Sequence, residues 1–362
     1  MRTTLLLIGA VVAASLTRLT AGTVSLLPAE VTALRALIAT NPAAAKESDA
    51  EHRWADKALA ATPNPIQTVI TEGHLDNDPK KVRTVASLAD MAKMEALGWA
   101  WAATGEARYA QKAREFILAW AQVNRPNGDA IDETQFESLI TVYDLLRDTD
   151  TFSAADRQAV DAWLREKATV LWKDRRGLDA NWYSHRLKIV GLIGWTIHDQ
   201  TLIDEAVKGY HHQINANLKA DGASTDFYRR DALHYHIYDI EPLLTLARTA
   251  ERNDVHLFAE RGTNGATLQS GVDFVIPFAN GTKTHVEFVN STVSFDRKRA
   301  ANGQGEYAPH PWKAHSAIRM FSLAAWFRPE YGTMVAELSG RPGDAFVNWQ
   351  MVLNAVSRPA GR

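Results

Sequence analysis

The chain has 362 residues, with 40 Lys and Arg against 42 Asp and Glu, and it contains no cysteine. The formal net charge of -2 gives no basic excess for binding nucleic acid by counterion release. The absence of cysteine excludes disulfides, thiolate nucleophiles and cysteine-ligated metals. With 46% hydrophobic residues the chain can bury a sizeable core, and its length permits two domains or one large toroid or barrel.

The first residues have the pattern of a secretory signal peptide. Arg2 precedes an apolar stretch over residues 3–14, and small residues follow at 20–22. The apolar stretch is shorter than the roughly 20 residues needed to cross a bilayer, and no later segment reaches that length. We therefore expect residues 1–22 to be a signal peptide, and residues 23–362 to form one domain that acts in the periplasm or is secreted, without membrane insertion.

The rest of the chain has mainly helical periodicity. Helices are expected at 25–39, from a cap at Ser48 to Pro63, and at 82–103, 107–123, 133–147, 153–172, 181–198, 201–218, 233–250, 262–275 and 311–327. Gly105 ends one of them, and Ser153 with Asp156 forms a capping pair at the start of another.

Strand-like alternation is scarce and is clearest over residues 284–295, where a small extended element is expected. About ten helices joined in hairpins are too many for one bundle core. The pattern predicts an all-α fold, an incomplete (α/α) toroid of helical hairpins with a small extended element near the C-terminal end.

Two polar segments interrupt this helical background. Residues 179–186 (DANWYSHR) run into an apolar helix, and residues 226–239 combine two arginines with several His and Tyr. Such a set, without a nucleophilic Ser or Cys, suits removal of a proton next to a carboxylate, as in β-elimination from a polyuronate. Amide and guanidinium groups stabilise the charge that develops on the uronate carboxylate, while a His or Tyr transfers the proton.

The chain resembles the alginate lyase domain family of α/α-toroid polysaccharide lyases over roughly residues 63–331. The resemblance is carried by the following motifs: Glu72-Gly73-His74 with Asp78-Pro79, Asp90 to Met94, Thr134 to Glu137 with Tyr143-Asp144, Asn181 to His185, and Ala232-Leu233-His234-Tyr235-His236. The last two motifs are the most specific.

The resemblance implies a role for each matching residue. Asn181 matches the residue that neutralises the carboxylate, His185 the base, and Tyr235 the acid, with Arg229 or Arg230 as the arginine partner. In the best-known branch the Asn and His are adjacent, whereas three residues separate them here. The spacing from Arg to Tyr also differs, so both arginines stay open, and Tyr235 acting as base and acid is the alternative to His185.

Further residues are expected to contact an anionic polysaccharide, because sugars stack on aromatic rings and uronates need donors. They are Glu72, His74, Gln135, Trp182, Tyr183, His234 and His236. No cofactor or metal is expected: His285-x-Glu287 supplies only two ligands, and it is assigned, with Asp296 and Arg299, to a structural or substrate-contact role. The C5 proton and O4 share one face in mannuronate and glucuronate but not in guluronate, so polymannuronate or glucuronan is the expected substrate.

Two other classes of function are consistent with the same sequence. A glycoside hydrolase on this toroid would need two carboxylates across the scissile bond. Candidates for such a pair are Asp132, Glu133, Glu137 and Asp239. The other class is a uronan-binding protein without catalytic activity.

Overall fold

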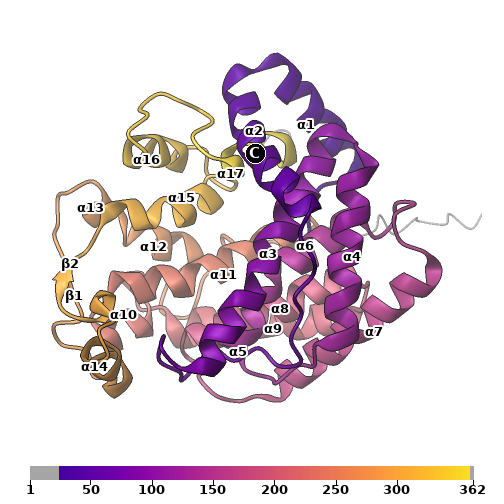
Figure 1. Cartoon of the computed structure of the whole chain (residues 1–362). Helices are drawn as coiled ribbons and strands as arrows, with labels where there is room; N and C mark the ends of the chain where they lie inside the picture. The colour runs from indigo at the N-terminus through magenta and orange to yellow at the C-terminus, as the bar shows by residue number, and fades with distance from the viewer. Residues whose placement is uncertain (1–23, 359–362) are drawn as a thin grey trace, which may run out of the picture.

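The computed structural model describes residues 24–358, so the expected signal peptide over 1–22 lies outside the described residues. The larger helices, shown in Figure 1, are α1 (Pro28–Thr40), α2 (Pro42–Leu59), α3 (Pro79–Thr104), α4 (Ala107–Val123), α6 (Glu137–Leu146), α7 (Ala154–Lys173), α8 (Asn181–Thr196), α9 (Gln200–Asn217), α11 (Leu233–Glu251), α14 (Ser294–Ala301), α16 (Tyr331–Leu338) and α17 (Trp349–Ser357). Shorter helices are α5 (Ala130–Glu133), α10 (Thr225–Arg230), α12 (Leu268–Asp273), α13 (Ile276–Ala279) and α15 (Ile318–Ala324).

Consecutive helices pack as hairpins around a shared core, which confirms the predicted all-α toroid. Helix α3 packs on α2, α4 and α6, and α8 packs on α7, α9 and α11. Along α8 every residue except Trp182 is buried. Two glycines let its neighbours approach: a Cβ at Gly191 would lie 2.4 Å from a methyl of Leu246 on α11, and one at Gly194 would lie 3.0 Å from the backbone of Ile203 on α9.

The two ends of the described chain meet. Helix α17 packs on α1 and α2, at the place where Figure 1 shows the last helix beside the first two. Leu34 and Val352 belong to the same small apolar cluster, which is separate from the main core. No helix among residues 24–358 combines the length and apolar character that crossing a membrane requires.

Local signals placed several helix ends correctly. Helix α4 has the predicted bounds, Gly105 ends α3 with φ +77°, and Ser153 with Asp156 forms the capping box of α7. The start of α2 was predicted wrongly. Ser48 is buried within that helix, and the side chain of Asn41 caps it by accepting hydrogen bonds from the amides of Ala43 and Ala44.

The extended element is smaller than predicted. Strand β1 (Val286–Glu287) pairs antiparallel with β2 (His310–Pro311), and the predicted extended segment already enters helix α14 at Ser294. The helix predicted over 262–275 is limited to α12 and is followed by α13. Strands β1 and β2 gather with α10 and α14 at one side of the molecule (Figure 1).

Candidate active site

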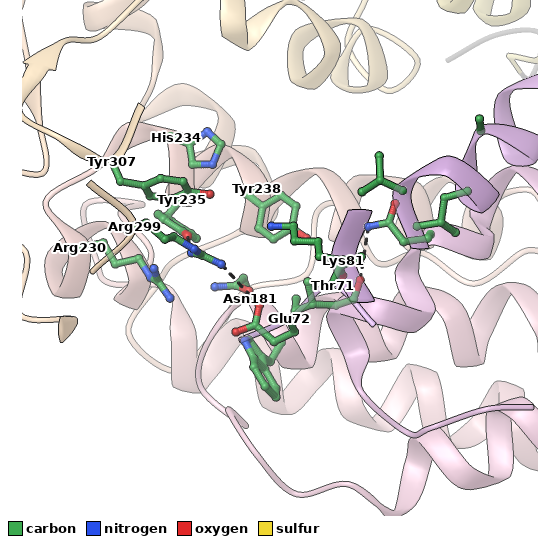
Figure 2. Close-up of a pocket in the computed structure, with 16 residues that line it drawn as sticks. Thr71, Glu72, Lys81, Asn181, Arg230, His234, Tyr235, Tyr238, Arg299 and Tyr307 are labelled. Carbon is green, nitrogen blue, oxygen red and sulfur yellow. Dashed lines mark hydrogen bonds and ion pairs between the residues drawn. The ribbon is translucent and has the colours of Figure 1, made fainter. Parts of the chain in front are cut away.

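A cleft of about 610 Å³ opens beside the N-terminal ends of α8 and α11. Figure 2 shows Tyr235, Arg299, Arg230 and Tyr307 on one side and Lys81 on the other, with Tyr238 between them. The lining residues are Thr71, Glu72, Lys81, Val85, Leu88, Ala89, Ile131, Gln135, Asn181, Trp182, Arg230, His234, Tyr235, Tyr238, Arg299 and Tyr307.

Tyr235 lies in the first turn of α11 between two guanidinium groups. Its hydroxyl accepts a hydrogen bond of 2.9 Å from Nη1 of Arg299, and the guanidinium carbon of Arg230 lies 3.7 Å from its ring centre. Burial raises the pKa of Tyr235 above its ordinary value of 10.0, while Arg230 and Arg299 act to lower it. The two arginines therefore favour the phenolate form, which a basic tyrosine needs.

Carboxylates beneath the cleft hold the polar groups in place. Oδ2 of the buried Asp226 accepts hydrogen bonds from the backbone N and the Nδ2 of Asn181, at 2.6 and 2.8 Å. Arg230 forms an ion pair of 2.5 Å with the buried Asp296 of α14. Asn181 and Arg230 thus keep fixed positions at the cleft surface, and the amide retains a second N–H for a ligand.

The opposite wall is a loop held by one buried carboxylate. Oδ1 of Asp132 accepts hydrogen bonds from the backbone and hydroxyl of Thr71, both at 2.6 Å, and from the backbone of Glu72 at 3.0 Å. Burial raises the pKa of Glu72, and the Arg299 guanidinium, 3.9 Å away, opposes that rise. A carboxylate of the wall loop is thereby placed beside Arg299, which also bonds the Tyr235 hydroxyl.

A sequence model of the alginate lyase family matches residues 38–285, which is more than half of the chain. The chain belongs to the alginate lyase family. It is accordingly a polysaccharide lyase. A comparison with curated protein sequences found no match.

Solved structures share the fold of this lyase. An alginate lyase from Bacteroides ovatus superposes with a TM-score of 0.69 at 16% identity, over 90% of this chain and 97% of that one. Alginate lyase A1-III from Sphingomonas species A1 gives 0.61 at 20% identity, over 83% and 87% of the two chains. A histidine-to-alanine variant of A1-III, complexed with a tetrasaccharide, gives 0.62 at 20% identity, over 85% and 87%.

The structure brings together most of the residues singled out from the sequence. Those that line the cleft are Asn181, Tyr235, Arg230, Glu72, Gln135, Trp182 and His234. The indole of Trp182 is backed by the guanidinium of Arg176, at 4.5 Å. Of the two candidate arginines, Arg230 lines the cleft and Arg229 does not. Arg229 instead forms an ion pair of 2.7 Å with Asp179, and both side chains of this pair are about half exposed.

His185 does not line the cleft. Its Nδ1 shares a hydrogen bond of 2.8 Å with the hydroxyl of Thr134, and its ring centre lies 4.2 Å from that of Tyr238. Burial, and after it the Lys188 ammonium, hold the pKa of His185 well below the ordinary value of 6.5. His185, one helical turn after Asn181, therefore lies beneath the cleft surface.

Three other expected contact residues also lie outside the cleft lining. Tyr183 is buried on α8 and packs against Trp172 and His212. His236 is fully buried; its Nδ1 accepts from the Ser224 amide at 3.1 Å, and its Nε2 donates to the Gly271 carbonyl at 2.8 Å. His74 is bonded through Nδ1 to Asp78 at 2.7 Å, at the start of α3.

Sequence reasoning did not assign several lining residues to the site: Thr71, Lys81, Tyr238, Arg299 and Tyr307. Tyr238 follows Tyr235 by three residues on one helix, a spacing that places both on the same face. Arg299 was given only a general structural or substrate-contact role, without a link to Tyr235, since nothing local connects the two residues. The two residues are 64 positions apart, and only the fold brings them together.

The carboxylates considered for hydrolysis are all engaged elsewhere, and none lines the cleft. Asp132 holds the wall loop, Glu133 forms a buried ion pair with Lys167, Glu137 pairs with Lys188 and Arg319, and Asp239 accepts from Ser184 and Asn217. Glu72 is the single carboxylate among the described lining residues, so the cleft has no carboxylate pair. In residues 24–358 no cluster of three or more His, Cys, Asp or Glu is placed to bind a metal.

Proposed function

We propose that this lyase cleaves 1,4-linked uronic acid polymers by β-elimination and leaves 4,5-unsaturated uronate ends. The observation that carries the proposal is the Tyr235 hydroxyl, which is held by Arg299 at 2.9 Å in a cleft that also presents Asn181 and Arg230. This set provides a proton-transfer group beside donors for a carboxylate.

In the proposed reaction, Asn181 and Arg230 bind the uronate carboxylate and stabilise the charge that spreads onto it as the C5–H bond breaks. The Tyr235 phenolate accepts the C5 proton. The electron pair forms the C4–C5 double bond, the bond from C4 to the glycosidic oxygen breaks, and Tyr235 returns its proton to that oxygen. The tyrosine ends the cycle as a phenolate, with Arg299 bonded to it throughout.

We infer that Tyr235 serves as both base and acid. The alternative base, His185, lies outside the cleft lining and is held by Thr134. A single residue that takes the proton and returns it acts on one face of the sugar, which requires the C5 proton and the leaving oxygen to be syn. This geometry supports polymannuronate or glucuronan as the substrate and disfavours polyguluronate.

The polymer is proposed to run along the cleft past Trp182. Its indole is stabilised from behind by Arg176 and offers a flat surface on which a sugar ring can stack. The variants of alginate lyase A1-III that are complexed with a tetrasaccharide have this fold, which supports the binding of an oligosaccharide chain here. We further propose that residues 1–22 direct the lyase to the periplasm or out of the cell, where such polymers are met.

The test is ultraviolet absorbance of the unsaturated product, measured with the chain from Thr23 onward on polymannuronate, glucuronan and polyguluronate. We expect absorbance to rise on one or both of the first two polymers, and Tyr235→Phe to abolish that rise. Tyr228→Phe is the matched control, because Tyr228 is exposed and bonds to Asp221 away from the cleft.

The other outcomes separate the alternatives. New reducing ends without absorbance would indicate hydrolysis. Binding of polymer without any product would indicate a uronan-binding protein. A strong preference for polyguluronate would contradict the syn arrangement at Tyr235.

A further inference from the structure

Helix α11 carries Tyr235 and Tyr238, two of the three tyrosines that line the cleft, yet its own sequence does not cap its N-terminus. The N-cap residue, Ala232, has no side chain that can accept a hydrogen bond, and Tyr235 is only the third residue of the helix. The first amides of a helix have no partner within it and need an acceptor from elsewhere. Whatever satisfies them also fixes the first turn, and with it the position of Tyr235.

The acceptor comes from strand β1, more than 50 residues further along the chain. Oε1 of Glu287 accepts a hydrogen bond of 3.0 Å from the backbone amide of His234. Glu287 is 1% exposed, and burial raises its pKa to about 7, while the amides of His234 and Leu233 oppose that rise. The accepting oxygen of this side chain faces the positive end of the α11 dipole.

The segment that carries Glu287 is bonded to the turn before α11. The amide of Phe288 donates to the Asp231 carbonyl at 2.7 Å, and the amide and side chain of Asn290 donate to Oδ2 of Asp231, at 2.8 and 3.0 Å. The two partners of the first bond both have left-handed backbones, with φ 50° at Asp231 and 62° at Phe288. Non-glycine residues adopt this conformation only where their surroundings impose it.

The same segment also contacts the reacting tyrosine directly. The ring of Phe288 packs edge-on against that of Tyr235, with ring centres 6.1 Å apart. Its neighbour Glu287 thus holds the backbone of the helix turn, while Phe288 holds the side chain.

We propose that Glu287, the residue of strand β1 that caps α11, is a positioning residue for Tyr235. By fixing the first turn of the helix, it places the Tyr235 hydroxyl within hydrogen-bond distance of Arg299. The inference rests on the proposed function, because Tyr235 is taken as the proton-transfer group. Oε2 of Glu287 has no hydrogen-bond partner among the described residues, and Nε2 of His285 lies 3.9 Å from it. The cap therefore requires only one accepting oxygen, and the side-chain amide of glutamine also supplies one.

The experiment compares Glu287→Ala with Glu287→Gln by elimination kinetics on the polymer that the wild type cleaves. We expect Glu287→Ala to lower kcat about 10- to 100-fold with KM changed less than about threefold, because a small displacement of a reacting group has effects of that size. Glu287→Gln keeps an oxygen for the His234 amide and should retain most of kcat.

Asp199→Ala is the matched control for lost stability. Asp199 caps α9 by accepting from the Leu202 amide, at the opposite end of α8 from Asn181. This variant should lose stability without a change in kcat. Equal loss of kcat in Glu287→Ala and Glu287→Gln, or unchanged kcat in Glu287→Ala, would overturn the inference.

Amide hydrogen exchange separates this inference from the proposed function. The amides of residues 233–236 should exchange faster in Glu287→Ala than in the wild type, and at nearly the wild-type rate in Glu287→Gln. If the wild type forms no unsaturated product, the proposed function fails, and exchange still tests the cap. Unchanged exchange in Glu287→Ala would refute the cap whatever the activity.

Discussion

The contact between Arg299 and Tyr235 gives the sharpest prediction about catalysis. Arg299→Met removes the guanidinium and keeps an unbranched stem that can pack against Phe295 and Tyr307, over which the guanidinium now lies at 4.3 and 4.6 Å. The lost interaction is the hydrogen bond of 2.9 Å to the Tyr235 oxygen, together with the longer ion pair to Glu72.

The size of the effect follows from the charge on the tyrosine. A hydrogen bond to a charged group contributes about 1.5–3 kcal/mol, and each 1.4 kcal/mol or so of barrier is about a factor of ten in rate. We therefore expect kcat to fall roughly 10- to 150-fold. Arg299 also acts to lower the pKa of Tyr235. Without it that pKa rises, so the ascending limb of the pH–kcat profile should move to higher pH.

The assay is the initial rate of unsaturated product formation across a pH series at saturating polymer. Lys298→Met is the matched control, because Lys298 is an exposed cation of the same helix and does not line the cleft. It should leave kcat and the pH profile unchanged. A kcat for Arg299→Met within about threefold of the wild type, with an unshifted profile, would show that the bond has no part in proton transfer.

Three further predictions concern stability, substrate binding and the cleft wall. Burial lowers the pKa of His236 from 6.5 to about 4, so on acidification this histidine is protonated in the unfolded chain before it is protonated in the folded protein. The unfolding free energy should therefore fall by about 3 kcal/mol as the pH drops from 6.5 to 4. Urea unfolding of His236→Gln, measured across the same pH range, should lack this pH-dependent loss of stability. Trp182→Ala should raise KM about tenfold with a smaller change in kcat, as expected for lost stacking; a kcat effect alone would argue against a sugar platform. Asp132→Ala removes the oxygen that accepts three hydrogen bonds from Thr71 and Glu72 and should lower both the melting temperature and kcat/KM; an unchanged kcat/KM would show that the wall loop has no part in catalysis.

The helices were predictable where their ends are marked by local chemistry. The Ser153 capping box and the left-handed Gly105 act within one turn, so the sequence reveals them directly. Prediction was weaker after residue 260, where helices are short and the strands have two residues each. There the backbone is held by bonds between distant segments, such as Thr292 to Arg229, which no periodicity records.

The candidate site was predictable in its chemistry and only partly in its membership. Asn181, Arg230 and Tyr235 line one cleft, as the two polar segments suggested, but His185, four residues after Asn181, does not. Position on a helix gives direction only relative to its neighbours, and α8 is surrounded by other helices over nearly its whole length. A residue one turn into such a helix is buried, whatever its chemical type.

The amino-acid sequence by itself determined a helical toroid, because periodicity and caps are local properties of the chain, and its motifs carried the resemblance to the alginate lyase family that pointed to an Asn, Arg and Tyr set. Tertiary structure alone decided which arginines meet Tyr235. Arg229 and Arg230 differ by about 100° around a helix, so one turns to Asp179 in solvent and the other to the cleft. Arg299 and Glu287 reach α11 only because the chain folds back beside it, and contacts between segments so far apart leave no periodic trace in the sequence.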